Sequence, residues 1–160
     1  MFAEASATQF DRVEWHLGAG FPKDLPKEAA ATHIGMFMAW ALQRKHEAYV
    51  HREAHLKQVE AVRARTMTGA RFVLECCDAK LSDHDLNGEG SAFAAHYYAK
   101  TYLTDYVDTL GADVDTVYHV PDTWDRFDQI ARVIDKRFAA WKEKLNAPPK
   151  KKKRKLKRQR

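Results

Sequence analysis

Two histidines four residues apart have the spacing that helices use to bind zinc. His51 and His55 fall in a stretch whose pattern predicts a helix, so both imidazoles would lie on one helix face. The metalloprotease motif places Glu directly after the first His, whereas here Glu53 stands two positions on. A solvated helix rich in charged residues explains the same pattern, and we favour it. We therefore predict no metal and no other cofactor.

A second group of residues could carry acid–base catalysis. A histidine lies in an otherwise apolar segment, and a loop combines acids, an amide and a lysine, the groups whose pKa a catalytic site would shift. The candidates are His33, Asp78, Lys80, Asp85, Asn87 and Glu89. A buried histidine held by one hydrogen bond and a loop that caps helix ends explain the same residues. The sequence favours this second interpretation.

The well-marked enzyme motifs do not occur in the sequence. It has no glycine-rich phosphate loop, no nucleophile elbow and no spaced cysteine quartet. The segment 83–88 begins like a calcium loop, but Ala94 stands where the bidentate Glu should be. We therefore expect that the protein is not an enzyme, with a catalytic site on the candidates above as the alternative.

The C-terminal segment could bind polyanions. The whole chain carries a formal charge of +5, and residues 150–160 supply nine positive charges, so residues 1–149 carry −4. A solvated basic segment attracts nucleic acid through its phosphates. The candidate nucleic-acid-binding residues are Lys150, Lys151, Lys152, Lys153, Arg154, Lys155, Lys157, Arg158 and Arg160. The tyrosines at 98, 102 and 106 could stack on bases, but we expect a helix face whose hydroxyls reach the surface.

The elements that must position these groups are helical. Apolar residues surround the segment from Thr32 to Leu42, which predicts a central helix, and amphipathic spacing predicts helices over 47–65, 68–78, 91–110 and 122–146. Residues 117–120 could form a short extended piece. We predict a mainly α fold: a single compact multi-helix domain over 1–146 with at most a short extended segment. A Pro-Pro pair and a disordered basic tail follow over 147–160.

Length and composition exclude further classes of protein. A chain of 160 residues suits one domain. No apolar run approaches the ~20 residues of a spanning helix, and the N-terminus does not resemble a signal peptide. The two cysteines, Cys76 and Cys77, are adjacent and best explained as reduced thiols. We expect a cytoplasmic protein with no membrane span.

Several blocks of the sequence resemble an uncharacterised family of small bacterial proteins, a domain of unknown function. The blocks include Glu14-Trp15-His16, the THIGMF segment from Thr32 with Ala39-Trp40, Cys77-Asp78-Ala79-Lys80-Leu81, Asp85-Leu86-Asn87 with Glu89-Gly90, Ala92-Phe93-Ala94, Tyr97-Tyr98, and Phe138-Ala139-Ala140-Trp141. The resemblance covers nearly all of residues 8–142. It implies a stand-alone bacterial domain and carries no known activity.

A protein-binding role is the expectation that these observations favour. An acidic body without catalytic motifs suits an immunity-type protein, which binds and neutralises a bacterial toxin, because acidic surfaces can cover a basic active-site cleft. The alternatives are a nucleic-acid-associated protein acting through the basic tail and an enzyme using His33 and the loop 78–89. The expected partners are therefore another protein, such as a toxin or effector, and nucleic acid that the tail binds without sequence preference.

Overall fold

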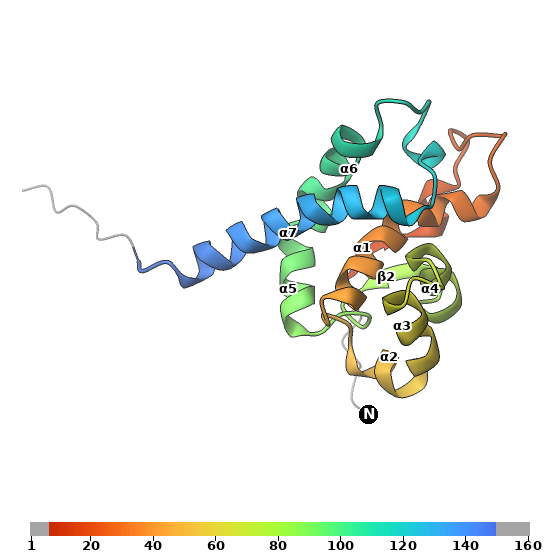
Figure 1. Ribbon diagram of the computed structural model, residues 1–160. Coiled ribbons are helices and arrows are strands. Elements are labelled where there is room, and N and C mark those ends of the chain that lie inside the picture. Colours follow the sequence, from red (N-terminus) through yellow and green to blue (C-terminus); the bar gives the residue numbers. More distant parts are fainter. Residues whose placement is uncertain (1–6, 150–160) are drawn as a thin grey trace, which may run out of the picture.

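The protein is described by a computed structural model that covers residues 7–149 (Figure 1). The predicted mainly helical fold is confirmed, with two short strands as the only extended elements among these residues. The elements in chain order are β1 (Gln9–Arg12), η1 (Val13–His16), η2 (Lys27–Ala31), α1 (Thr32–Gln43), α2 (Tyr49–Ala54), α3 (Leu56–Arg63), α4 (Gly69–Cys76), β2 (Lys80–Ser82), α5 (Gly88–His96), η3 (Tyr98–Tyr102), α6 (Leu103–Leu110), η4 (Val117–His119) and α7 (Trp124–Asn146). Within 7–149, no helix combines the length and apolarity needed to cross a membrane.

Helix α1 forms the centre of the core, as its sequence predicts. Every residue from Thr32 to Leu42 is buried. Helices α3, α4 and α7 pack around it, and Figure 1 shows α1 in the middle of the fold. A helix that is apolar on nearly all sides has to be enclosed by other elements, because any open side would leave apolar area in water.

Two glycines allow α1 and α4 to touch through their backbones. A Cβ on Gly35 of α1 would lie 2.5 Å from the carbonyl carbon of Gly69, the first residue of α4. A Cβ on Gly69 would in turn lie 2.8 Å from the Cβ of Ala39. Both distances are shorter than real Cβ contacts, so only glycine fits at either position. This contact fixes where α4 lies relative to α1.

The two strands bring the N-terminal segment against the turn that follows α4. Strands β1 and β2 are antiparallel, with Asp11 opposite Leu81 and an irregularity between Gln9 and Asp11. The pairing continues as the Val13 amide donates to the Ala79 carbonyl at 2.9 Å. Asp11 is thereby held as a buried residue at the end of β1.

The helix predicted over 47–65 is broken into α2 and α3. His55, with φ −132° and ψ 34°, leaves the helical conformation between them. The change of direction lets α3 bury Val59 and Val62 while α2 buries His51. No glycine or proline marks this break, which follows from tertiary packing.

The helix predicted over 91–110 begins earlier and is also interrupted. It begins at Gly88, where the Asn87 side chain accepts a hydrogen bond from the Gly90 amide at 2.7 Å. A π-helical turn then spans Tyr98–Tyr102 before α6. The prediction that the tyrosine hydroxyls reach the surface is wrong: Tyr98, Tyr102 and Tyr106 are buried. Their rings fill the space beside α1 instead.

The closing helix α7 agrees with its predicted span. The Thr123 hydroxyl accepts a hydrogen bond from the Arg126 amide at 3.2 Å and caps the helix. Its first half packs on α1 and α6, and the Trp40 indole donates to Asp135 at 2.7 Å. Figure 1 shows its C-terminal end projecting away from the other helices.

Candidate functional site

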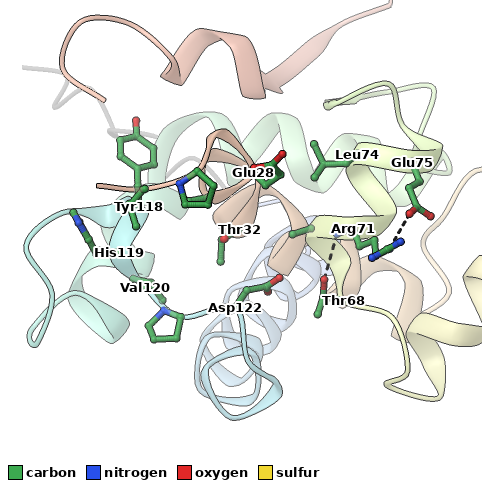
Figure 2. Close-up of a pocket in the computed structure, with 15 residues that line it drawn as sticks. Glu28, Thr32, Thr68, Arg71, Leu74, Glu75, Tyr118, His119, Val120 and Asp122 are labelled. Atoms are coloured by element: carbon green, nitrogen blue, oxygen red, sulfur yellow. Dashed lines mark hydrogen bonds and ion pairs between the residues drawn. The ribbon is translucent and has the colours of Figure 1, made fainter. Parts of the chain in front are cut away.

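An open groove of about 500 Å³ lies along one side of α1 and α4 (Figure 2). Three segments form its walls: the loop and turn before α1, the first two turns of α4, and the segment that leads into α7. The residues that line it are Leu25, Pro26, Glu28, Ala29, Thr32, Thr68, Ala70, Arg71, Leu74, Glu75, Tyr118, His119, Val120, Pro121 and Asp122. The glycine contact between α1 and α4 positions two of these three walls.

The segment 117–120, for which an extended piece was predicted, forms the 3₁₀ turn η4. The Thr116 hydroxyl accepts from the Tyr118 amide at 3.2 Å and caps the turn. His119 makes a side-chain contact of 3.0 Å with Asp24, which ties η4 to the loop before α1. Figure 2 shows Tyr118 and His119 on one side of the groove and Leu74 and Arg71 on the other.

The groove combines an apolar lining with an excess of acid. Apolar atoms form most of the lining surface, and seven of the fifteen lining residues are leucine, proline, alanine or valine. Among its charged residues are the carboxylates of Glu28, Glu75 and Asp122 and one guanidinium, Arg71. Arg71 is already paired with Glu75 at 2.7 Å, one helical turn away. A cation entering the groove would therefore meet two carboxylates with no ion-pair partner among the described residues.

Asp122 is the carboxylate most affected by its surroundings. The residue as a whole is exposed, but its carboxyl group lies against the groove wall near Thr32 and Thr68 (Figure 2). Desolvation by the surrounding protein raises its pKa, and Thr68 lowers it only in part. A positive charge placed beside this carboxyl would offset the cost of keeping it ionised.

Tyr118 connects the groove to a buried polar cluster behind it. Its hydroxyl lies 2.8 Å from Nδ1 of His16, and Nε2 of His16 lies 2.7 Å from Oδ1 of Asp11. On the other side of the carboxylate, Nε2 of His33 lies 3.2 Å from Oδ2. The Tyr98 hydroxyl also donates to Oδ2. Asp11 thus joins β1, η1, α1 and η3.

The cluster is arranged so that its hydrogen bonds stabilise the ionised carboxylate of Asp11. Burial alone would raise the pKa of Asp11, but hydrogen bonds from His16, His33 and Tyr98 hold it well below its usual range. Burial lowers the pKa of His33, although Asp11 opposes this shift, so its imidazole is neutral at pH 7. The cluster therefore presents an ionised carboxylate and a neutral imidazole.

A cavity of about 170 Å³ adjoins this cluster. It is lined by Phe10, Asp11, His16, His33, Tyr98, Ala99, Tyr102 and Leu103. His33 itself is only 2% exposed, and its ring lies edge-on to His16 with the centroids 4.6 Å apart. The predicted catalytic candidate His33 is therefore a buried residue that borders a small hollow.

Asp85, another catalytic candidate, belongs to a second buried cluster. Its Oδ1 lies 2.9 Å from Nε2 of His51, and Nδ1 of His51 lies 3.1 Å from Nδ1 of His55. Sγ of Cys77 lies 3.7 Å from the same Nε2. Burial, reinforced by Asp85, raises the pKa of the Cys77 thiol. The two predicted zinc candidates, His51 and His55, thus contact each other and lead from a buried carboxylate towards the surface.

The remaining catalytic candidates do not join either buried cluster. Asp78 is exposed, with a φ of 58°, and lies 3.9 Å from Lys80. Asn87 caps α5. Glu89 is exposed and pairs with Lys142 of α7 at 2.6 Å. The structure therefore brings Asp85 to His51 and His33 to Asp11, and it does not gather the loop 78–89 around His33.

The predicted nucleic-acid-binding residues, Lys150 to Arg160, lie outside the described residues. Sequence reasoning missed Asp11, His16 and Tyr98, although His16 and Tyr98 fall in the blocks that carry the family resemblance. Asp11 gave no local signal, because its histidine and tyrosine partners come from other elements. The groove was missed as well, since it depends on how three distant segments pack.

Comparisons with known proteins identify the family. A family model described as a domain of unknown function (DUF7832) matches residues 9–120. This stretch includes both polar clusters and all of the groove except Pro121 and Asp122. No curated protein and no solved structure matches the chain. The predicted membership in a domain family of unknown function is confirmed over residues 9–120, and the chain belongs to the DUF7832 family of domains of unknown function.

Proposed function

We propose that this protein is a protein-binding module whose groove receives a basic segment of its partner. The observation that carries the proposal is the groove of about 500 Å³, in which an apolar lining is combined with three carboxylates and a single, already paired arginine. Specific binding sites are usually concave and largely apolar, with a few polar groups that fix orientation.

A lysine or arginine side chain fits this lining better than an anion or a fully apolar group. Its methylene stem would pack on the walls made by Leu25, Ala29 and Leu74 while its charged end approaches Asp122 or Glu28. Asp122 favours the same occupant, because desolvation raises its pKa and a neighbouring positive charge would favour its ionised form.

The finer proposal is an immunity-type protein of a bacterial cytoplasm. The partner would be a toxin with a basic cleft, such as one that acts on nucleic acid. Residues 1–149 carry −4, and complementary charge accelerates the encounter of two proteins. The two free cysteines, Cys76 and Cys77, are consistent with a reducing compartment. Binding alone would neutralise the toxin, and the protein would turn over no substrate of its own.

A pair of charge reversals tests the proposal. Glu28→Lys places a positive charge in the groove, and Glu143→Lys makes the same change on an exposed position of α7. We expect the partner, purified from the native host, to bind the control like the unmodified chain. Glu28→Lys should bind it at least about tenfold more weakly, mostly through slower association at low salt. Equal affinity of both variants would argue against the groove.

Nucleic-acid binding through the basic tail stays the second candidate, favoured by the nine Lys and Arg residues in the sequence. Its test compares the full chain with a chain that ends at Asn146 on a labelled DNA duplex. The tail proposal expects binding that falls steeply with salt and is lost on truncation. Duplex binding that persists in the truncated chain would exclude the tail as its cause.

A further inference from the structure

We infer that Asp11, His16 and His33 form a binding site for one divalent transition-metal ion. The inference concerns the cluster behind the groove and does not depend on the proposed partner. The three side chains come from β1, η1 and α1, and all three donor atoms lie within 4.8 Å of one another.

Two of the donor-atom pairs are spaced like neighbouring ligands of one ion. Oδ1 of Asp11 lies 2.7 Å from Nε2 of His16, and Oδ2 lies 3.2 Å from Nε2 of His33. With metal–ligand bonds of about 2.0–2.2 Å, adjacent ligand atoms are about 2.9–3.5 Å apart. The third pair, Nε2 of His16 and Nε2 of His33, lies within 4.8 Å, so binding one ion would draw the two imidazoles closer together around the carboxylate.

Two of the three ligands, His16 and Asp11, already have the second contacts that metal sites require. A metal at Nε2 of His16 leaves the proton on Nδ1, which then donates to the Tyr118 hydroxyl 2.8 Å away. A hydroxyl can accept as well as donate, so Tyr118 suits both the free and the metal-bound histidine. The Arg12 amide, at 2.8 Å, and the Tyr98 hydroxyl hold the Asp11 carboxylate in place.

The adjoining cavity leaves room for ligands that the protein does not supply. Its volume of about 170 Å³ would hold several water molecules or a small anion beside the ion. Three protein ligands with open positions are typical of reactive metal centres, whereas closed four-ligand sites are structural. Two imidazoles and one carboxylate favour Zn²⁺ or Fe²⁺ over the oxygen-preferring Mg²⁺ and Ca²⁺.

The cluster of His51, Cys77 and Asp85 is the weaker candidate. It also offers three donor types within 4.8 Å, but no cavity described for residues 7–149 borders it. His51 and Asp85 already complete a hydrogen-bonded chain with His55 and Ser82. Because this cluster contains a thiol, a metal bound there would give a different spectrum.

Titration of the untagged, chelator-stripped full chain with Zn²⁺ and Co²⁺ tests the inference. We expect one Zn²⁺ per chain by calorimetry and a Co²⁺ spectrum without a thiolate charge-transfer band. His16→Gln and Asp11→Asn should each weaken binding at least about 100-fold, whereas His84→Gln, at an exposed site outside the cluster, should bind unchanged. Absent binding, equal binding by all variants, or a thiolate band would overturn the inference.

A second readout on the unmodified chain removes the dependence on variants that fail to fold. Long-range ¹H–¹⁵N spectra report the state of each imidazole nitrogen. Addition of Zn²⁺ should shift Nε2 of His16 and His33 and leave the resonances of His51 in place. A shift of His51 with no change at His16 and His33 would contradict the assignment.

Discussion

Replacing Gly35 with alanine should destabilise the whole domain, because the α1–α4 contact has no room for a methyl group. The new Cβ would lie 2.5 Å from the Gly69 carbonyl carbon. Favourable carbon–carbon contacts are about 3.5–4.0 Å, and backbone atoms of Ala70 lie closer still, so the two backbones would have to separate by at least about 1 Å. The obstacle is backbone, which cannot rotate away as a flexible side chain would.

The magnitude follows from two opposing effects. Overpacking a well-packed core costs about 1–3 kcal/mol, occasionally more, and an obstacle made of backbone belongs at the upper end or beyond. Alanine in place of glycine within a helix returns at most about 1 kcal/mol. We expect Gly35→Ala to lower the free energy of unfolding by about 2–3 kcal/mol. For a chain of this size, that lowers the melting temperature by roughly 4–12 °C.

The same substitution at Gly88 provides the control. Gly88 is the first residue of α5, and nothing lies within 4 Å of a Cβ built there. Thermal and urea unfolding would be compared for the unmodified chain and the two variants. The free energy of unfolding should fall by the amount given above in Gly35→Ala and change by no more than about 1 kcal/mol in Gly88→Ala. If both variants unfold alike, the close approach of α1 and α4 is wrong, and the groove walls built on it are wrong too.

Two further predictions concern ionisation. Burial opposes ionisation of Asp105, but hydrogen bonds from Arg137 and Tyr97 lower its pKa. The ionised carboxylate therefore stabilises the fold above about pH 4, and this stabilisation is lost as the pH falls below that value. The free energy of unfolding would be measured by urea titration from pH 6 to pH 2.5. Asp105→Asn should be less stable than the unmodified chain at pH 6 and should lose less stability on acidification. The same dependence of stability on pH in both proteins would refute this prediction. The second prediction is that Cys76 reacts with iodoacetamide before Cys77, which is buried and has the more strongly raised pKa. Mass spectrometry of the native protein should find the label first on Cys76, and prior labelling of Cys77 would contradict its burial.

The spacing of apolar residues was sufficient to predict a helix where that helix buries one continuous face. The enclosed helix from Thr32 and the long amphipathic helix that ends at Asn146 could both be predicted from their apolar spacing. The breaks at His55 and at Tyr98–Tyr102 could not, because neither contains glycine or proline and both depend on packing against α1 and its neighbours.

The polar clusters show why single-sequence reasoning assigned the wrong neighbours to His33. The sequence places His33 on the core helix and suggests no partner. The loop 78–89 was predicted as its partner because it is rich in acidic residues, but in the fold these acidic residues do not pair with His33. Its actual partner, Asp11, lies 22 positions earlier and reaches it through β1. Contacts of this kind follow from strand pairing, for which a four-residue strand gives almost no sequence signal.

Site-specific photo-cross-linking in the native host tests the central claim, that the groove binds a basic segment of another protein. A photoreactive residue would replace Leu74, which lines the groove, or Leu145, which is 60% exposed near the end of α7. We predict one discrete protein adduct from position 74, joined through a peptide that contains lysine or arginine, and no such adduct from position 145. No protein adduct at position 74, or the same adducts at both positions, would contradict the claim.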